Sequence, residues 1–348
     1  MILVLRKMSD LSLNIEPFLL LSARLPVIDV RSPAEYHHAH FPGAVSMPLF
    51  SNEERSVIGT LYLQKGSKEA MVKGLEYIGP RMKDYALAGS RIAPGGEALM
   101  YCWRGGMRSN SMAWLMNTVG IRTSILTGGY KTFRKYVLDY FRKNLNLVVI
   151  GGMTGSGKTA VLESLESNGA QVIHLERLAR HKGSVFGSVN MPEQPSSEQF
   201  ENELFAGLYK LDYQKPVFIE DESLAIGKVF IPRDLYDQMS VARFINLEVS
   251  VEARIEMLLD NYTGGDTTQL VDGVRKLEKR LGKEKADRAI EMIKSNNLAD
   301  AIAIVLKYYD KIYSRSMSQH QRKEAHVMTI NTFSAEDIAD SIMNTIGT

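Results

Sequence analysis

The amino-acid sequence predicts an α/β protein in which two domains, each with a mainly parallel sheet, are followed by a helical extension. Three observations lead to this prediction. Short apolar runs alternate with segments of helical spacing in two successive series, a glycine-rich loop separates one apolar run from a helix-like segment, and charged residues beyond residue 250 recur on a helical period. At 348 residues, the chain is long enough to form two ordinary cores.

The first domain is predicted to cover residues 12–141. Its strands are expected at four short apolar runs, residues 27–30, 44–47, 99–102 and 124–126. Segments with helical spacing, such as residues 109–119, separate these runs, as is typical of a parallel sheet. Residues 130–146 predict a joining helix without a Pro/Gly/Ser linker, so we expect this domain to pack against the next one.

The second domain is predicted to cover residues 145–250. Its strands are expected at residues 147–150, 172–175, 217–220 and 244–248. From about residue 251 the strand signals end, and charged residues recur on a helical period in residues 251–261, 266–281 and 286–295. The sequence therefore predicts a helical C-terminal extension over residues 251–348.

The composition narrows the class of protein. With 45% hydrophobic and 24% charged residues, the chain is predicted to be folded rather than disordered. No apolar run approaches the roughly 18 residues of a membrane span, and the first residues lack a signal-peptide pattern, so we expect a cytoplasmic protein without a membrane partner. The single cysteine excludes an internal disulfide framework, and the net charge of +2 leaves a nucleic-acid partner open.

A phosphate-binding loop is predicted at residues 152–159, GMTGSGKT, which fit the pattern G-x-x-x-x-G-K-[ST]. The loop follows a predicted strand and precedes a helix-like segment, where backbone N–H groups converge on phosphate oxygens. The lysine adds a positive charge, and the threonine hydroxyl is a ligand for Mg²⁺. The predicted phosphate-binding residues are Gly152, Gly155, Ser156, Gly157, Lys158 and Thr159.

Three consecutive acidic residues, Glu220, Asp221 and Glu222, lie at the end of the predicted strand at residues 217–220. A carboxylate at such a strand end commonly orients Mg²⁺ or a substrate hydroxyl beside a phosphate loop. We expect a magnesium site that includes Thr159 and Asp221. Pairing of a glutamate with a structural arginine is the alternative.

Residues 99–109, LMYCWRGGMRS, place the only cysteine at the end of a predicted strand, before a glycine-bearing loop and a helix. Such a loop directs backbone N–H groups inward, where they stabilise a thiolate and bind a tetrahedral anion. A buried structural cysteine is the alternative. The predicted site comprises the nucleophile Cys102 and its anion-binding neighbours Arg104, Gly105, Gly106 and Arg108.

Residues 27–36, VIDVRSPAEY, and residues 40–44, HFPGA, resemble the two characteristic stretches of the rhodanese domain. The resemblance covers residues 20–141 and places Cys102 where that family keeps its sulfur-carrying cysteine. It implies that His40 belongs to a structural turn rather than to a metal cluster with His37 and His38. It also implies a structural ion-pair set that comprises Asp29, Arg31 and Glu35.

The cysteine loop departs from the common rhodanese pattern C-x4-R, because Arg108 lies six positions after Cys102. The resulting C-x5-R-[ST] pattern is also that of cysteine-dependent phosphatases. A phosphatase or arsenate reductase fused to a P-loop domain is therefore a competing prediction, although the sequence offers no obvious general acid. An ATP-dependent kinase with a regulatory rhodanese-like domain is a second alternative, which leaves ATP binding open.

The whole chain resembles the bacterial tRNA 2-selenouridine synthase family. Besides the two loops, the matching stretches are residues 52–60, 97–108 and 128–131, residues 175–187, LERLARHKGSVFG, and residues 219–223, IEDES. Ser156 occupies a position that can be cysteine in the family, which leaves Cys102 as the only possible thiol carrier.

This resemblance implies a transferase that changes the wobble 2-thiouridine of certain tRNAs in two steps. Geranyl diphosphate, bound by the phosphate loop with Mg²⁺, first geranylates the sulfur. Selenium from selenophosphate then displaces the geranylthio group, either through a perselenide on Cys102 or by direct attack. The implied partners are tRNA and an enzyme that produces selenophosphate.

Two basic stretches each have two possible interpretations. Arg180, His181, Lys182 and Ser184 either face the phosphate or tRNA, or form a solvated loop. Residues 275–285, RKLEKRLGKEK, are either a face that binds the tRNA backbone or an exposed helix. The tyrosines at positions 308, 309 and 313 are expected in a core.

Overall fold

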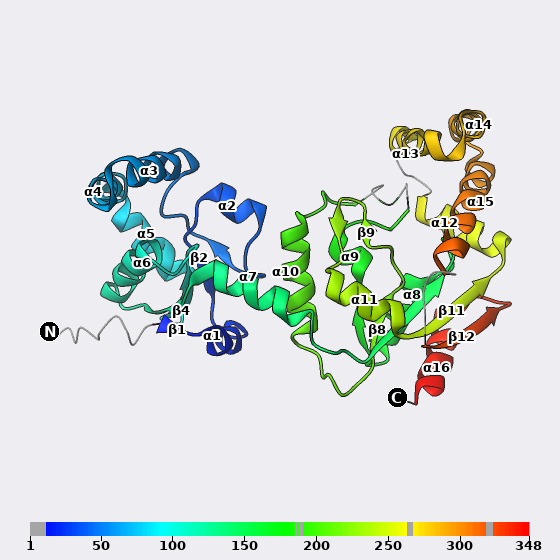
Figure 1. Ribbon diagram of the computed structural model, residues 1–348, viewed down its shortest axis with the longest axis horizontal. Helices are drawn as coiled ribbons and strands as arrows, with labels where there is room; N and C mark the ends of the chain where they lie inside the picture. The colour runs from blue at the N-terminus through cyan, green and yellow to red at the C-terminus, as the bar shows by residue number, and fades with distance from the viewer. Residues whose placement is uncertain (1–11, 185–186, 188–190, 263–266, 318–322, 348) are drawn as a thin grey trace. The chain divides into compact units, whose positions relative to one another are not determined.

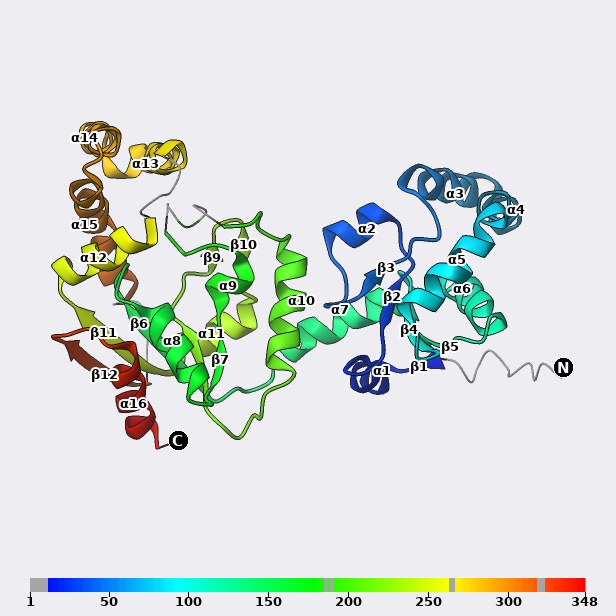
Figure 2. The same cartoon turned by 180° about the vertical axis from the view of Figure 1, so that it is seen from behind.

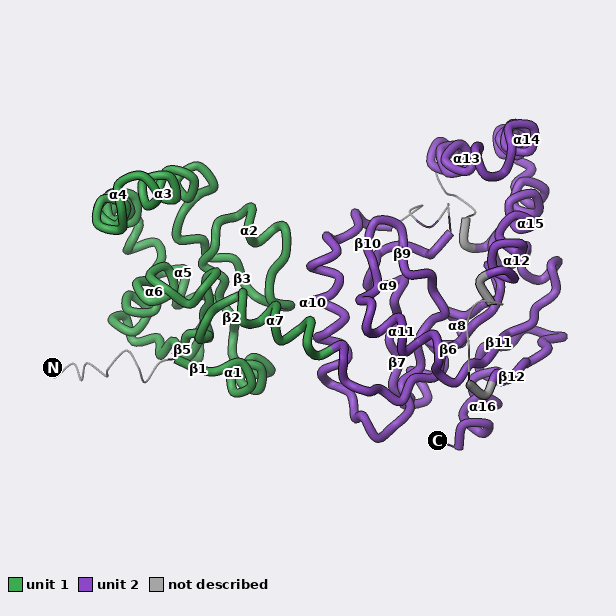
Figure 3. Tube along the Cα trace, in the orientation of Figure 1, with its two compact units in different colours: residues 1–140 green, residues 141–348 purple. Residues whose placement is uncertain are grey.

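The computed structural model describes residues 12–184, 187, 191–262, 267–317 and 323–347 (Figure 1). The chain divides into two compact units, residues 1–140 and residues 141–348 (Figure 3). Each unit contains its own five-stranded parallel sheet with helices around it. The predicted α/β class with a helical C-terminal region is confirmed.

The sheet of unit 1 has the strand order β1-β5-β4-β2-β3. Its strands are β1 (Ser12–Leu13), β2 (Val27–Asp29), β3 (Val45–Ser46), β4 (Glu97–Tyr101) and β5 (Arg122–Leu126). The helices are α1 (Ile15–Ser22), α2 (Pro33–His38), α3 (Asn52–Lys65), α4 (Ser67–Ile78), α5 (Met82–Ile92), α6 (Met107–Thr118) and α7 (Gly129–Tyr140), with the 3-10 turn η2 (Gly79–Arg81) before α5. The four predicted strands are present, and β1 is an addition.

Two apolar layers enclose this sheet. One contains side chains of α6, such as Met112 and Met116, packed with strand residues such as Met100 and Ile125. On the other, the rings of Phe41 and Phe133 lie 4.7 Å apart. Because parallel strands present their carboxyl ends at one edge, the loop after β4 and the start of α2 lie at the same edge of the sheet.

The sheet of unit 2 has the order β12-β11-β6-β8-β7. Its strands are β6 (Leu147–Gly152), β7 (Gln171–Ile173), β8 (Val217–Glu220), β11 (Arg243–Val249) and β12 (Lys323–Ile330), and β9 (Ala225–Ile226) pairs antiparallel with β10 (Val229–Phe230). The helices are α8 (Lys158–Ser167), α9 (Leu175–Ala179), α10 (Ser197–Leu208), α11 (Arg233–Val241), α12 (Val251–Tyr262), α13 (Thr267–Leu281), α14 (Lys283–Lys294), α15 (Leu298–Met317) and α16 (Ala335–Ile346).

Helices α8 and α16 lie together on one face of this sheet, where they close a core with β6 and β11 (Figures 1 and 2). Helices α12 to α15 form a second apolar cluster of their own. The predicted helices after residue 250 are therefore present. No helix in the part of the chain that the structure describes is long and apolar enough to cross a membrane.

Two sequence-based expectations are wrong. Strands do not end at residue 251, because β12 lies parallel to β11 along its length. β12 is an edge strand in which Met328 and Ile330 contact the core while Val327 is 52% exposed, so its apolar pattern is weak. The joining helix ends at Tyr140 rather than at residue 146. The packing of the two domains against each other stays a prediction.

Candidate functional sites in the cysteine loop and the phosphate loop

Cys102 is the first residue after β4 and lies beneath the loop that leads into α6. Its side chain is only 3% exposed and packs in the apolar layer of unit 1. The sulfur lies 3.2 Å from the hydroxyl oxygen of Ser109, which donates to the carbonyl of Gly106 at 3.1 Å. The thiol is thus both buried, as the structural alternative expects, and placed under a glycine loop.

The cysteine loop is held by the glycine turn before α7. The N–H of Tyr130 donates to the carbonyl of Cys102 at 2.8 Å. Gly105 has a φ of +64°, and a Cβ atom there would lie 2.7 Å from the carbonyl oxygen of Leu126. Gly106 precedes α6, and no atom lies within 4 Å of where its Cβ would be. The loop is therefore packed on one side and open at its second glycine.

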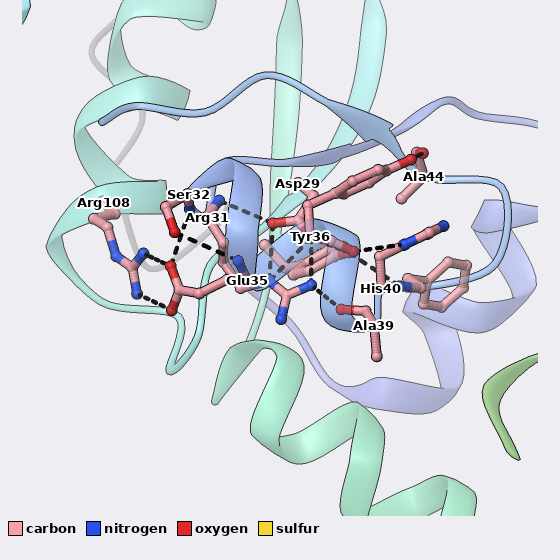
Figure 4. Close-up of polar contacts among 11 residues, drawn as sticks. Asp29, Arg31, Ser32, Glu35, Tyr36, Ala39, His40, Ala44 and Arg108 are labelled. Atoms are coloured by element: carbon pink, nitrogen blue, oxygen red, sulfur yellow. Dashed lines mark hydrogen bonds and ion pairs between the residues drawn. The ribbon is translucent and has the colours of Figure 1, made fainter. Parts of the chain in front are cut away.

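Glu35 anchors Arg108 to α2 (Figure 4). Nη1 of Arg108 lies 2.7 Å from Oε2 of Glu35, which also accepts the backbone N–H of Ser32 at 3.0 Å. Burial alone would raise the pKa of Glu35, but the hydrogen bond and charge of Arg108 outweigh burial and lower it. Arg104 is exposed. The two arginines predicted to serve one anion site therefore have different surroundings.

The remaining members of the expected ion-pair set form a separate buried group. Arg31 and Asp29 pair at 2.6 Å, and the hydroxyl of Tyr101 donates to the same carboxylate at 2.6 Å. The ring of His40 stacks on Tyr36 at 4.0 Å (Figure 4). His40 lies between α2 and the turn of residues 41–44, and its Nδ1 atom is 2.9 Å from the carbonyl oxygen of Tyr36.

The phosphate loop lies between β6 and α8, at the centre of the sheet of unit 2. Gly155 and Gly157 have φ angles of +81° and +78°, which favour glycine. Nζ of Lys158 donates to the carbonyl of Gly152 at 2.9 Å, so the lysine spans the loop. The hydroxyl of Ser156 is buried and has no hydrogen-bond partner within the described residues. The expected strand, loop and helix are all present.

Three glutamates lie close together beside the phosphate loop, of which Glu220 is buried and Glu176 and Glu222 are half-buried. The backbone N–H of Glu176 donates to Glu220 at 2.8 Å, and a Cβ atom at Gly183 would lie 2.9 Å from carboxylate oxygens of both Glu176 and Glu222. Burial and the charge of Glu176 raise the pKa of Glu220 to about 8 and that of Glu222 well above its ordinary value. Glu176 also has a raised pKa, mainly through burial. Each of the three carboxyl groups therefore favours its protonated form more than an exposed glutamate does.

The two residues expected to bind magnesium have different hydrogen-bond partners, and the magnesium site stays a prediction. The hydroxyl of Thr159 lies 3.4 Å from Oε2 of Glu176, whereas Asp221 accepts a hydrogen bond from Tyr313 at 3.1 Å. Among the residues described, no three His, Cys, Asp or Glu side chains are grouped to hold a metal. Thr159 and Glu176 supply oxygen donors, which fit Mg²⁺ when phosphate and water complete its shell.

The other residues predicted for the second domain differ in their contacts and burial. Arg180 ends α9 and donates to the carbonyl of Glu193 at 3.1 Å. His181 has a buried Nδ1 atom without a partner in the described part of the chain, and burial and the charge of Lys276 on α13 lower its pKa. Ser184 is buried.

The sequence did not predict Glu176 or the two residues that form hydrogen bonds with the backbone of the phosphate loop, Arg254 and Tyr313. Arg254 of α12 is 2% exposed, donates to the carbonyl of Thr154 at 3.2 Å and pairs with Asp310 of α15 at 2.8 Å. The hydroxyl of Tyr313 accepts the N–H of Gly152 at 2.8 Å. Glu176 could have been found, since it directly follows a predicted strand. The other two contacts join residues 100 and 161 positions apart, for which the sequence carries no local signal.

Fold and sites together define a rhodanese-like domain fused to a P-loop domain. Comparison with protein families agrees, because residues 19–136 match the rhodanese-like domain. Residues 145–343 match the tRNA 2-selenouridine synthase AAA domain.

Curated relatives extend this match to most of the chain. A tRNA 2-selenouridine synthase of Nitrosomonas europaea is 38% identical over 69% of this chain, and the chain spans 64% of that relative's length. Proteins of the same name from Sulfurovum sp. and Hydrogenovibrio crunogenus are each 33% identical, over 85% and 86% of this chain and 89% and 91% of their own lengths. The chain belongs to the tRNA 2-selenouridine synthase family.

Proposed function

We propose that this chain is a transferase that replaces sulfur by selenium in the wobble 2-thiouridine of tRNA, through an S-geranyl-2-thiouridine intermediate. Geranyl diphosphate and selenophosphate are its co-substrates. The observation that carries the proposal is that relatives named tRNA 2-selenouridine synthase align with both units, together with both anion-binding loops. A cytoplasmic location and supply by a selenophosphate-producing enzyme follow from these substrates.

In the first step, the phosphate loop binds the diphosphate group of geranyl diphosphate. The sulfur of 2-thiouridine attacks C1 of the geranyl group, so that a C–S bond forms, a C–O bond breaks and diphosphate leaves. Lys158 and the loop N–H groups stabilise the negative charge that develops on diphosphate. Thr159 and Glu176 would hold Mg²⁺, which when bound neutralises part of the same charge. This step consumes no ATP.

In the second step, loop N–H groups and the exposed Arg104 hold the phosphate group of selenophosphate above Cys102. By the direct route, the selenium atom of selenophosphate attacks C2 of the uridine and geranylthiol leaves. Water then attacks phosphorus, the P–Se bond breaks, and orthophosphate is released. By the cysteine route, the Cys102 thiolate attacks selenium, the Se–P bond breaks, and phosphite leaves with its electron pair, which gives a perselenide. The terminal selenium then attacks C2 and geranylthiol leaves, after which a thiol reductant cleaves the S–Se bond to release the selenated uridine and Cys102. The two routes therefore differ in their phosphorus product.

The tRNA partner is expected at the basic stretch of residues 275–285, which runs from the end of α13 into the start of α14. Besides burial, the positive charge of Lys276 lowers the pKa of His181, which indicates that Lys276 lies near His181 in unit 2. Cationic side chains on one helix bind phosphates of an RNA backbone.

Nucleoside mass spectrometry tests the proposal. Purified protein is incubated with 2-thiouridine tRNA, geranyl diphosphate and Mg²⁺, and then with selenophosphate. We expect the geranylated and then the selenated nucleoside, with Lys158→Ala blocking the first step and, by the cysteine route, Cys102→Ala blocking the second. Lys215→Ala, an exposed lysine before β8 at the opposite end of the sheet, is the control and should keep both steps. Absence of both mass changes with the unmodified chain would refute the proposal.

Phosphorus-31 NMR of the selenation mixture separates the two selenium routes. Orthophosphate as the product indicates direct attack, in which case Cys102→Ser retains measurable selenation. Phosphite as the product indicates the perselenide, in which case Cys102→Ser is inactive in this step.

A further inference from the structure

A narrow apolar cavity of about 10 Å³ adjoins the phosphate loop inside unit 2. Its apolar walls are Leu258 of α12 and Ile302, Val305, Leu306 and Tyr309 of α15. Its polar end consists of Thr154 in the phosphate loop and Ser184. The cavity therefore extends from the phosphate loop to a mainly apolar end between α12 and α15.

The cavity is continuous with the phosphate loop rather than merely close to it. A Cβ atom at Gly155 would lie 2.9 Å from the side chain of Leu258, so this wall touches the loop itself. Arg254, one turn earlier in α12, donates to the carbonyl of Thr154 at 3.2 Å and pairs with Asp310 of α15. These bonds fix the loop and the two helices of the cavity as one assembly.

The chemistry of the walls selects the class of ligand. A nucleoside next to its phosphates needs hydrogen-bond partners for base and ribose, whereas the five apolar side chains offer none beyond the hydroxyl of Tyr309. A hydrocarbon chain needs only apolar surface, and its burial there is favourable. A phosphate ester of a hydrocarbon thus matches both ends of the site.

We propose that the seam between α12 and α15 holds the prenyl chain of the diphosphate ester bound in the phosphate loop, and that Val305 and Leu306 limit the length of this chain. The proposal rests on the proposed function for the identity of the ester as geranyl diphosphate. The side chains fill most of the seam, so the chain enters by separating the side chains of α12 and α15.

Ligand binding by isothermal titration calorimetry tests the seam directly. We expect the unmodified chain to bind geranyl diphosphate at least tenfold more tightly than inorganic diphosphate. Val305→Phe, which fills the seam, should weaken geranyl diphosphate about tenfold and leave inorganic diphosphate unchanged. Ile304→Phe is the matched control, because Ile304 lies on the same helix but not in the cavity wall.

Chain-length preference provides the second measurement. Leu306→Ala should raise the affinity for farnesyl relative to geranyl diphosphate at least fivefold, and Ile304→Ala should not. Equal binding of geranyl and inorganic diphosphate by the unmodified chain would overturn the inference. So would equal weakening of both ligands in Val305→Phe, or a Leu306→Ala variant that behaves as Ile304→Ala.

Failure of the inference and failure of the proposed function have different results. Geranylation of tRNA with an unchanged chain-length preference in Leu306→Ala rejects the seam and leaves the function in place. Tight, seam-dependent binding of geranyl diphosphate without any geranylated nucleoside supports the seam and rejects the function. Far-UV circular dichroism of each variant identifies any loss of folding.

Discussion

Glu35 connects the start of α2 to the arginine of the cysteine loop. Its carboxylate accepts both the N–H of Ser32 and the guanidinium of Arg108, so one side chain serves as helix cap and as counter-ion. Arg108 is thereby held to the scaffold, while Arg104 is exposed. We infer that Arg108 mainly shapes the loop and that Arg104 meets the incoming anion.

Replacement of Glu35 by glutamine should reduce the stability of unit 1 by about 1 kcal/mol at neutral pH. The folded pKa of Glu35 is lowered, so its stabilisation is present above the ordinary value of 4.5 and is lost as pH falls through the folded pKa. The difference in stability between the unmodified chain and the Glu35→Gln variant should therefore disappear as the pH is lowered. Tryptophan fluorescence in denaturant measures it, since both tryptophans, Trp103 and Trp114, lie in unit 1.

Glu76→Gln is the control for this measurement, because Glu76 is 57% exposed and pairs only with an exposed lysine. It should change stability by a few tenths of a kcal/mol at any pH. A Glu35→Gln protein whose deficit is the same at pH 3 and pH 7 would contradict the assigned role.

Replacement of Glu220 by glutamine should have the opposite pH dependence. The pKa of Glu220 is raised to about 8, so the unfolded chain ionises at this position before the native chain does. Native stability should fall as pH rises from about 4.5 to about 8, and Glu220→Gln should remove part of this fall. At roughly 1.4 kcal/mol per pKa unit, the difference is at most a few kcal/mol.

Hydrogen exchange of peptides from β6 and β8 measures this local stability as a function of pH. Glu291→Gln, an exposed carboxylate of α14, is the control and should follow the unmodified chain. An exchange profile of Glu220→Gln that parallels the unmodified chain from pH 4.5 to pH 8 would show that Glu220 is ionised in the native state.

Two helices from the C-terminal part of the chain hold the phosphate loop in place. Arg254 of α12 holds the carbonyl of Thr154, and Tyr313 of α15 joins the N–H of Gly152 to the carboxylate of Asp221. These contacts satisfy backbone groups that would otherwise be buried without partners. The C-terminal helices are therefore part of the phosphate site.

Tyr313→Phe should weaken binding of inorganic diphosphate about fivefold, the effect of one lost hydrogen bond worth about 1 kcal/mol. Tyr308→Phe removes a hydroxyl from the same helix and should leave the affinity unchanged. Isothermal titration calorimetry compares the two. Equal affinities in both variants would mean that α15 does not support the loop.

Each of the two loops proposed to bind anions belongs to one compact unit, the cysteine loop to unit 1 and the phosphate loop to unit 2. Among the described residues, the hydrogen bonds of Cys102 and Arg108 join residues of unit 1, and those of Lys158 and Thr159 join residues of unit 2. In the proposed reaction each unit therefore carries one step, and the geranylated tRNA connects the two.

A mixture of the Lys158→Ala and Cys102→Ala proteins should therefore restore selenation that neither variant performs alone. The Cys102→Ala protein supplies geranylated tRNA, which the Lys158→Ala protein converts. Nucleoside mass spectrometry of the mixture and of each variant alone makes the comparison. Accumulation of geranylated nucleoside without selenation in the mixture would show that both steps must occur in one chain.

The sequence by itself determined the α/β class, the positions of most strands and both loops. Each of these features is encoded in contiguous residues: the phosphate loop needs glycines at fixed spacing between a strand and a helix, and Cys102 needs only the glycine loop after its strand. The edge strand β12 was not predicted from the sequence, because side chains such as that of Val327 face away from the core.

Only the tertiary structure decided which side chains meet at the sites. It joined Glu35 to Arg108, placed Glu176 beside Thr159, and brought Arg254 and Tyr313 into contact with the backbone of the phosphate loop. These contacts link distant parts of the chain, so they depend on strand order and helix packing. A local pattern carries information about its own backbone conformation, whereas the partners of a side chain are set by the elements that folding places next to it.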